Sequence, residues 1–171
     1  MPAVLAPDLR VVFCGINPSL YSGAVGHHFA RPGNRFWKVL HAAGFTPHVL
    51  SPFDDRQLLA SRLGVTNLVA RATATADELG DRELRAGAAR LARAARRYRP
   101  ATVAVLGVAA YRVAFERPQA VVGRQAETLG DSRLWVLPNP SGLNAHYQLP
   151  ALTSLFAELR RADDDGAQGA R

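Results

Sequence analysis

The sequence predicts an α/β fold, a three-layer α/β/α sandwich around a short, mainly parallel sheet. Apolar runs of strand length alternate along the chain with helical patterns, as they do in repeated strand–helix–strand units. The runs at 11–14 and 102–106 are apolar throughout, which is typical of parallel strands covered on both faces. Because crossover connections are right-handed, successive helices are expected to cover both faces of the sheet.

The first strand is expected at 10–15. The segment at 20–32 after it is longer than the roughly two to six residues usual between a strand and a helix, which indicates a functional loop. Helices are then expected at 33–43 and 54–62, before a second strand at 64–69.

The longest helix is expected at 76–98, opened by a capping box between Thr75 and Glu78. Apolar periodicity stops after residue 162, so we expect a single domain at 1–162 and a disordered tail at 163–171. The elements between the longest helix and the tail are a strand at 101–107, a helix at 107–116, a strand at 133–138 and a helix at 148–162.

The charge of the chain favours a polyanionic partner. Its 171 residues include 21 lysines and arginines against 14 aspartates and glutamates, a net charge of +7, and only Lys38 is a lysine. Nucleic acid is the obvious candidate, although arginine enrichment can also reflect a GC-rich genome. Six arginines of the longest expected helix form either a solvated face or a DNA-contacting one: Arg82, Arg85, Arg90, Arg93, Arg96 and Arg97.

Other features exclude whole classes of protein. The single cysteine, Cys14, lies in an apolar run, which excludes an internal disulfide framework and a four-cysteine zinc or iron–sulfur site. No apolar run approaches the roughly 20 residues of a membrane span, and the first residues lack the features of a signal peptide. We expect a cytoplasmic monomer that has no membrane association and no obligate protein partner, and that lies on the nucleoid when it binds DNA.

Two Asn-Pro turns carry most of the functional information. The turn at 15–19 follows the apolar run at 11–14, and the turn at 139–143 follows the run at 134–138. Each turn therefore presents an amide side chain at the carboxyl end of a strand, which is the edge where open α/β sheets bind ligands. We expect the two turns to form the two lips of one cleft.

Four segments together resemble the mismatch-specific uracil/thymine-DNA glycosylases of the uracil-DNA glycosylase superfamily. They are GINPS at 15–19, HHFARPGNRFWKVLHAAGF at 27–45, GVTNLV at 64–69 and LPNPSGLN at 137–144. The resemblance implies hydrolysis of the N-glycosidic bond of a uracil flipped out of mismatched double-stranded DNA, such as a G·U pair. This reaction starts base excision repair, leaves an abasic site, and needs no cofactor and no metal.

The resemblance assigns the chemistry to the first lip. Asn17 would position the attacking water, although an Asn-Pro pair can also serve only its own turn. Phe29 would stack on the flipped base, a contact worth about 1 to 3 kcal/mol, and the backbone groups of Ile16 and Phe29 would read the uracil edge. Ser19 stands where the family often has glycine, which leaves acceptance of thymine open.

The second lip would open the duplex. The resemblance places Asn139 near the target base or its phosphate, and it makes Leu143 an apolar wedge, a common device for unstacking DNA. The remaining DNA contacts would come from Ser22, Ser141, Gly142 and Asn144.

Asp77 is a second candidate for the group that activates water. It follows the strand at 64–69 in a loop that leaves the same edge, and it reaches the cleft if that loop folds inward. Otherwise its carboxylate stabilises the N-terminus of the following helix. No lysine is well placed to form a Schiff base, since Lys38 lies in the helix after the first loop, so we expect a monofunctional enzyme.

Two other functions are compatible with parts of the pattern. A non-catalytic module that binds mismatched or abasic DNA would keep the wedge without efficient hydrolysis. A nucleotide hydrolase is disfavoured, because the sequence has no glycine-rich P-loop and no acidic metal cluster in its expected core. Release of free uracil separates the glycosylase from the binding module.

Overall fold

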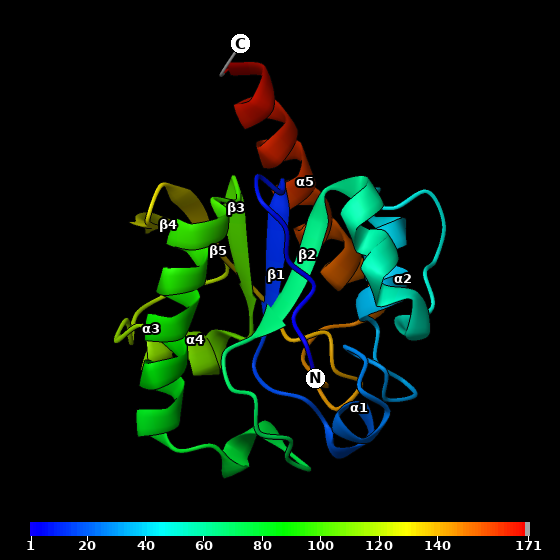
Figure 1. Cartoon of the computed structure of the whole chain (residues 1–171), viewed down its shortest axis with the longest axis vertical. Helices are drawn as coiled ribbons and strands as arrows, with labels where there is room; N and C mark the ends of the chain where they lie inside the picture. Colours follow the sequence, from blue (N-terminus) through cyan, green and yellow to red (C-terminus); the bar gives the residue numbers. More distant parts are fainter. Residues whose placement is uncertain (170–171) are drawn as a thin grey trace.

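The computed structural model describes residues 1–169 and is built on a single five-stranded sheet (Figure 1). The strand order is β2-β1-β3-β5-β4, and neighbouring strands are parallel except for β4 and β5. The predicted α/β class with a mainly parallel sheet is confirmed. The strands are β1 (Val11–Gly15), β2 (Leu63–Asn67), β3 (Thr102–Leu106), β4 (Gly123–Leu129) and β5 (Ser132–Leu137).

Alternation along the central strands divides the core into two halves. Val11 and Phe13 of β1 pack in one half and Cys14 in the other, while Ala104 and Val105 of β3 are divided in the same way. Every residue of β1 and β3 is buried, as their continuous apolar sequence predicts. Burial raises the pKa of the Cys14 thiol far above its usual range, which fits a packing role.

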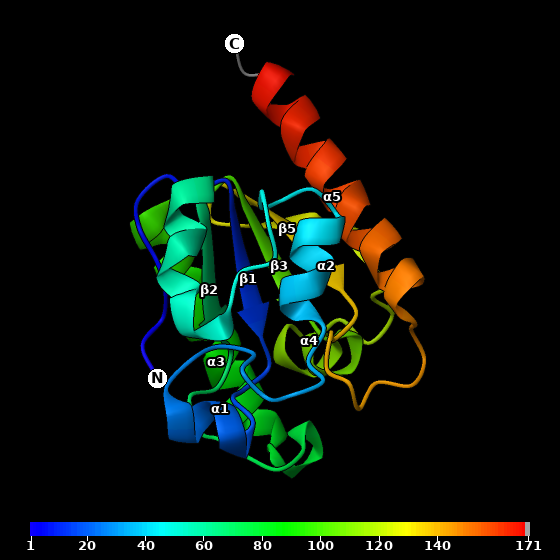
Figure 2. The same ribbon diagram turned by 90° about the vertical axis from the view of Figure 1, so that its right-hand side faces the viewer.

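Helices cover both faces of the sheet, as Figures 1 and 2 show. One face carries α2 (Phe36–Ala42), the 3₁₀ helix η1 (Pro52–Ser61) and α5 (Leu149–Gly169). The other carries α3 (Asp81–Tyr98) and α4 (Val108–Ala114). Two short helices, α1 (Leu20–Val25) and the 3₁₀ helix η2 (Ala76–Glu78), lie toward the carboxyl ends of the parallel strands (Figure 1).

The helix expected at 76–98 is divided in two. Thr75 N donates to Glu78 Oε2 at 3.0 Å, as in a capping box, but this cap opens only η2. Gly80 N then donates to Glu83 Oε1 at 3.2 Å and opens α3. The capping box predicted from Thr75 and Glu78 is present, and a second backbone cap of the same kind, at Gly80, starts the long helix.

The sequence prediction missed α1 and β4. Helix α1 has only six residues, and Ser19 Oγ caps it by accepting from Ser22 N at 3.1 Å. Strand β4 is the antiparallel edge strand, in which half-buried and exposed residues alternate. It therefore lacks the continuous apolar run that marks a strand covered on both faces.

The tail expected to be disordered at 163–171 is instead helical from 163 to 169, as the last part of α5. Asp163 is buried, and Arg10 Nε donates to its Oδ2 at 2.9 Å. Arg10 also donates to Asp164 Oδ1 at 2.6 Å. These ion pairs hold a segment that has no apolar periodicity, and the rest of the expected tail, residues 170–171, lies outside the described residues.

Candidate active site

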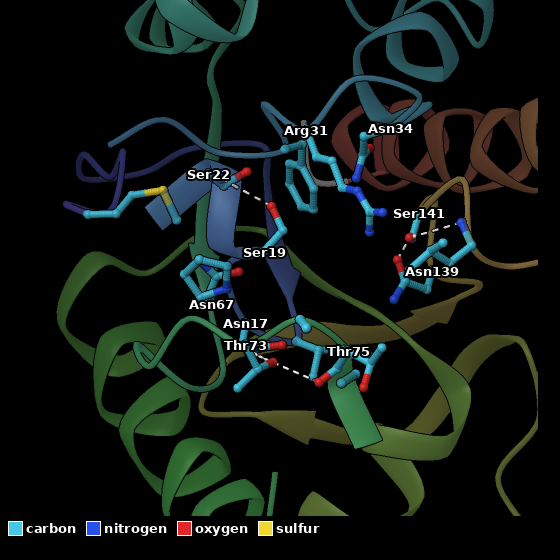
Figure 3. Close-up of a pocket in the computed structure, with 17 residues that line it drawn as sticks. Asn17, Ser19, Ser22, Arg31, Asn34, Asn67, Thr73, Thr75, Asn139 and Ser141 are labelled. Carbon is cyan, nitrogen blue, oxygen red and sulfur yellow. Dashed lines mark hydrogen bonds between the residues drawn. The ribbon is translucent and has the colours of Figure 1, made fainter. Parts of the chain in front are cut away.

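The two Asn-Pro turns face each other across one cavity at the carboxyl edge of the sheet (Figure 3). Asn17 lies on one side with Thr73 and Thr75, and Asn139 lies on the other with Ser141. The cavity volume is about 90 Å³, several times the roughly 10–15 Å³ that one water requires. The cavity is lined by eight residues predicted from the sequence, namely Ile16, Asn17, Ser19, Ser22, Phe29, Asn139, Ser141 and Leu143.

The Asn17 amide has a defined orientation. Its Nδ2 donates to Arg71 O at 2.8 Å and to Thr73 Oγ1 at 2.7 Å. Because a backbone carbonyl can only accept, the nitrogen must point toward Arg71. The Thr73 hydroxyl in turn donates to Thr75 O at 2.7 Å. Within residues 1–169 no group donates to Asn17 Oδ1, so this oxygen is an acceptor that can hold a water molecule.

Phe29 forms one wall of the cavity. Its ring stacks on Phe36, with centroids 4.1 Å apart and ring planes at 29°. Phe29 has a φ of 52°, a left-handed conformation that is uncommon outside glycine and needs support from its surroundings. Gly15 makes room for the ring, since a Cβ there would lie 3.1 Å from Phe29 Cζ and 2.6 Å from Asn67 Oδ1.

Buried contacts support the loop at 27–31 that carries this ring. His28 Nε2 lies 2.8 Å from Pro2 O, so Nε2 carries the proton. Burial lowers the pKa of His28, which favours the neutral ring. Trp37 Nε1 donates to His28 O at 3.2 Å, and Ser22 Oγ accepts from Ala30 N at 3.0 Å.

Asn67, the last residue of β2, also lines the cavity. With the His28 proton on Nε2, Nδ1 is an acceptor, and Asn67 Nδ2 faces it at 3.5 Å. The Asn67 amide nitrogen is therefore directed to the loop and its oxygen toward the end of β1. In the sequence, Asn67 falls within the strand expected at 64–69, in the segment GVTNLV that carries part of the resemblance.

The loop at 139–147 is folded by its own polar side chains. Asn139 Oδ1 accepts from Ser141 N at 2.9 Å, and Ser141 Oγ accepts from Leu143 N at 3.2 Å. Asn144 Nδ2 donates to Asn139 O at 3.0 Å. Leu143 is 59% exposed at the rim of the cavity. A tightly turned loop with an exposed apolar side chain has the form of a wedge that can enter a duplex.

The loop at 139–147 is in contact with the segment that precedes α2. A Cβ on Gly142 would lie 2.7 Å from Gly33 O, so glycine allows the two backbones to approach this closely. Arg35, just before α2, donates to several carbonyl oxygens of the 139–147 loop, including Ser141 O at 2.7 Å. Sequence reasoning missed Arg35, because a side chain that binds backbone carbonyls leaves no pairing signal in the sequence.

A profile of the Uracil DNA glycosylase superfamily matches residues 2–161, which is nearly the whole chain. The chain belongs to the uracil DNA glycosylase superfamily. Its fold is similar to the solution NMR structure of a "putative Uracil DNA glycosylase" from Methanosarcina acetivorans, with a TM-score of 0.60 and 20% identity over 94% of this chain and 96% of that one. The resemblance seen in four segments is thus confirmed at the level of the superfamily, and membership supports a DNA glycosylase role.

Asp77 is the second residue that the sequence predicts to be catalytic. It lies outside the cavity that holds Asn17. It is exposed, and it lines a neighbouring groove together with Arg112 and Tyr147. Ile16 and Leu143 border both hollows. The Asp77 carboxylate therefore borders the neighbouring groove rather than the cavity that holds Asn17.

The predicted DNA-binding residues fall into two groups. Ser22 is only 2% exposed, and its hydroxyl supports the Phe29 loop, so the expected phosphate contact does not fit its burial. Ser19, predicted to contact the base, lines the cavity but also caps α1. The second group lies on the 139–147 loop around Leu143 and consists of Ser141, Gly142 and Asn144.

An ion pair supports the segment that orients Asn17. Arg71 donates to both carboxylate oxygens of Glu83, at 3.1 and 2.8 Å. Hydrogen bonding from Arg71 lowers the pKa of Glu83 to about 2. Since Arg71 O accepts from Asn17, this surface pair helps to fix the carbonyl that orients the amide.

Within residues 1–169, no three His, Cys, Asp or Glu side chains are gathered as metal ligands would be. No helix of this part of the chain combines the length and apolar character needed to cross a membrane.

Proposed function

We propose that the protein is a monofunctional DNA glycosylase that flips uracil out of mismatched double-stranded DNA, such as a G·U pair, and hydrolyses its glycosidic bond. One observation carries the proposal: the oriented amide of Asn17 and the ring of Phe29 line a single cavity, and Leu143 projects from the rim of that cavity. A stacked base cannot enter such a cavity, so the nucleotide must be extruded, which costs least at a mismatch.

The cavity offers a flipped uracil both stacking and polar contacts. The Phe29 ring would cover one face of the base, a contact worth about 1 to 3 kcal/mol. Polar partners for the uracil edge would come from the backbone of Ile16 and Phe29 and from the amides of Asn67 and Asn139, which line the same cavity. Ser19 would narrow the pocket compared with glycine, so we expect thymine to be a poorer substrate than uracil.

Hydrolysis would use a water held by Asn17 Oδ1. The bond between the sugar C1′ and the base nitrogen breaks, its electron pair leaves with the uracil, and the water oxygen bonds to C1′. An amide oxygen is too weak a base to take the water's proton early, so bond breaking would run ahead of attack, through an oxocarbenium-like sugar. The proton passes to the uracil anion or to solvent once the new C–O bond has formed.

The strand would stay intact after the base has left. A lysine-based lyase step requires a lysine amine that attacks C1′, and the only lysine of the sequence, Lys38, is exposed on α2 and does not line the cavity. The product would be an unbroken strand with an abasic site, ready for the later steps of base excision repair.

Single-turnover assays test the proposal. Enzyme in excess over a G·U duplex, at a concentration that saturates the DNA, should release free uracil and leave a strand that breaks only after alkali. A matched A·U duplex should react more slowly, because its uracil is harder to extrude. If the protein binds the G·U duplex but releases no uracil, it is a mismatch-binding module and the glycosylase proposal is wrong.

A further inference from the structure

Arg35 makes an unusual set of contacts with the 139–147 loop. Its Nε donates to Pro140 O at 3.2 Å, and one terminal nitrogen donates to Ser141 O at 2.7 Å and to Asn144 O at 3.2 Å. The other terminal nitrogen donates to Tyr147 O. The backbone N–H of Arg35 also donates to Pro140 O, at 3.1 Å. One half-buried side chain thus gathers carbonyl oxygens from both ends of the loop.

These bonds suit a guanidinium and no other side chain. A guanidinium is planar and has five N–H donors in a fixed fork, and four of them are used here. Within residues 1–169 no carboxylate lies within 4.0 Å of Arg35, so the loop carbonyls are its partners rather than an acidic side chain. An isolated cation in this place serves to shape the loop.

The same segment supports the base platform. Arg35 immediately precedes Phe36, whose ring carries the Phe29 ring at 4.1 Å. Asn34, on the other side of Arg35, lines the cavity, and its Oδ1 accepts from Phe36 N at 2.9 Å. Residues 34–36, at and just before the start of α2, therefore contact the Phe29 ring through Phe36 and the 139–147 loop through Arg35.

We propose that Arg35 is a positioning residue that fixes the position of the Leu143 side chain, the wedge, relative to the Phe29 ring, the stacking platform. Entry of Leu143 into the duplex and arrival of the base on Phe29 then occur as one step, since one rigid segment holds both. This inference rests on the proposed glycosylase function. Arg35 does not line the cavity that holds Asn17, so its effect should be confined to substrates that must be opened.

The test compares two uracil duplexes in single-turnover assays. In one, uracil lies opposite guanine; in the other, it lies opposite an abasic site, where little unstacking is required. Arg35→Gln should slow release from the G·U duplex roughly tenfold and change the other substrate much less. Arg35→Lys should recover only part of the rate, because one ammonium cannot reach four carbonyls. Lys38→Gln, which removes an exposed cation from the adjoining helix α2, should match the wild type on both duplexes.

A double variant separates positioning from loss of fold. In a Leu143→Ala background, Arg35→Gln should cause no further loss on the G·U duplex, because the wedge it positions has been removed. A fluorescent base beside the uracil, which brightens on unstacking, should report a smaller flipped fraction for Arg35→Gln. Additive losses in the double variant, or equal losses on both duplexes, would overturn the proposal. If the wild type releases uracil from neither duplex, the proposed glycosylase function itself is overturned.

Discussion

At the scale of single residues, the orientation of the Asn17 amide is central to the proposed chemistry. Arg71 O accepts from its nitrogen at 2.8 Å, which leaves the amide oxygen for water. An aspartate in the same place would set a carboxylate oxygen against the Arg71 carbonyl oxygen, and neither can donate. The local backbone therefore explains why an amide fits this position better than a carboxylate.

We expect Asn17→Ala to slow uracil release from a G·U duplex by about a hundredfold or more in single-turnover assays. Its dissociation constant for the same duplex should change little, because the 139–147 loop makes the main DNA contacts in this proposal. Thr73→Val is the graded control, since it removes one partner of the amide nitrogen and keeps Arg71 O. It should fall between the wild type and Asn17→Ala. Wild-type rates for Asn17→Ala would exclude Asn17 from water activation.

The residues predicted from motifs line two different hollows, for identifiable reasons. Asn17, Phe29 and Leu143 belong to segments with strong local signals, and all three line one cavity. Asp77 lies in a 3₁₀ turn whose direction no local pattern reveals, and the structure directs it to the neighbouring groove. Arg35 was missed because its partners are backbone carbonyls about a hundred residues away in the sequence.

At the scale of elements, the loop at 27–31 depends on a neutral histidine. His28 donates from Nε2 to Pro2 O, and Asn67 Nδ2 donates to its Nδ1. Protonation would place a second N–H opposite the Asn67 amide nitrogen, so that two donors face each other. Burial already lowers the pKa of His28 from its usual value of 6.5. Acid should therefore loosen this loop and the Phe29 platform it carries.

The sign of the effect on stability follows from linkage. Below about pH 6.5 the unfolded chain takes up a proton at His28 that the folded chain resists. The contribution of neutral His28 to the free energy of unfolding is therefore fully present above this pH, and it is lost as the pH falls toward the lowered pKa of the folded protein. We expect the wild-type free energy of unfolding in urea to drop more between about pH 7.5 and about pH 5.5 than that of His28→Gln. Glutamine can donate to Pro2 O without titrating. His27 and Asp55 are unchanged in both proteins, so equal drops would contradict the role of His28.

Elements held by distant contacts were the ones that sequence patterns could not predict. The core strands β1 and β3 are continuously apolar, and this local signal was sufficient. The last part of α5 is held by ion pairs between Arg10 and the pair Asp163 and Asp164, more than 150 residues apart. No window of sequence contains both partners, so the segment resembled a polar tail.

At the scale of the whole molecule, the parallel sheet brings the two Asn-Pro turns to one edge, while the last arginines of α3 lie far from that edge. Helix α3 starts beside this edge and runs along the flank to the opposite end of the sheet (Figure 1). Arg93, Arg96 and Arg97 lie 12 to 16 residues beyond Asp81, which is about 18 to 24 Å along the helix axis. A short duplex laid across the carboxyl edge would not reach them.

Salt dependence of binding can decide whether these arginines touch DNA or only attract it. Each phosphate contact adds about 0.9 to the slope of log K against log salt. Replacing Arg93, Arg96 and Arg97 together with glutamine should leave that slope nearly unchanged for a short G·U duplex, because salt screens charges that lie this far from the DNA. Arg31→Gln, at the exposed rim of the cavity, should reduce the slope by about 0.9. A decrease near 2.7 for the triple variant would instead mean that the flank of α3 contacts phosphates, and the duplex would then have to bend around the molecule rather than lie across one edge.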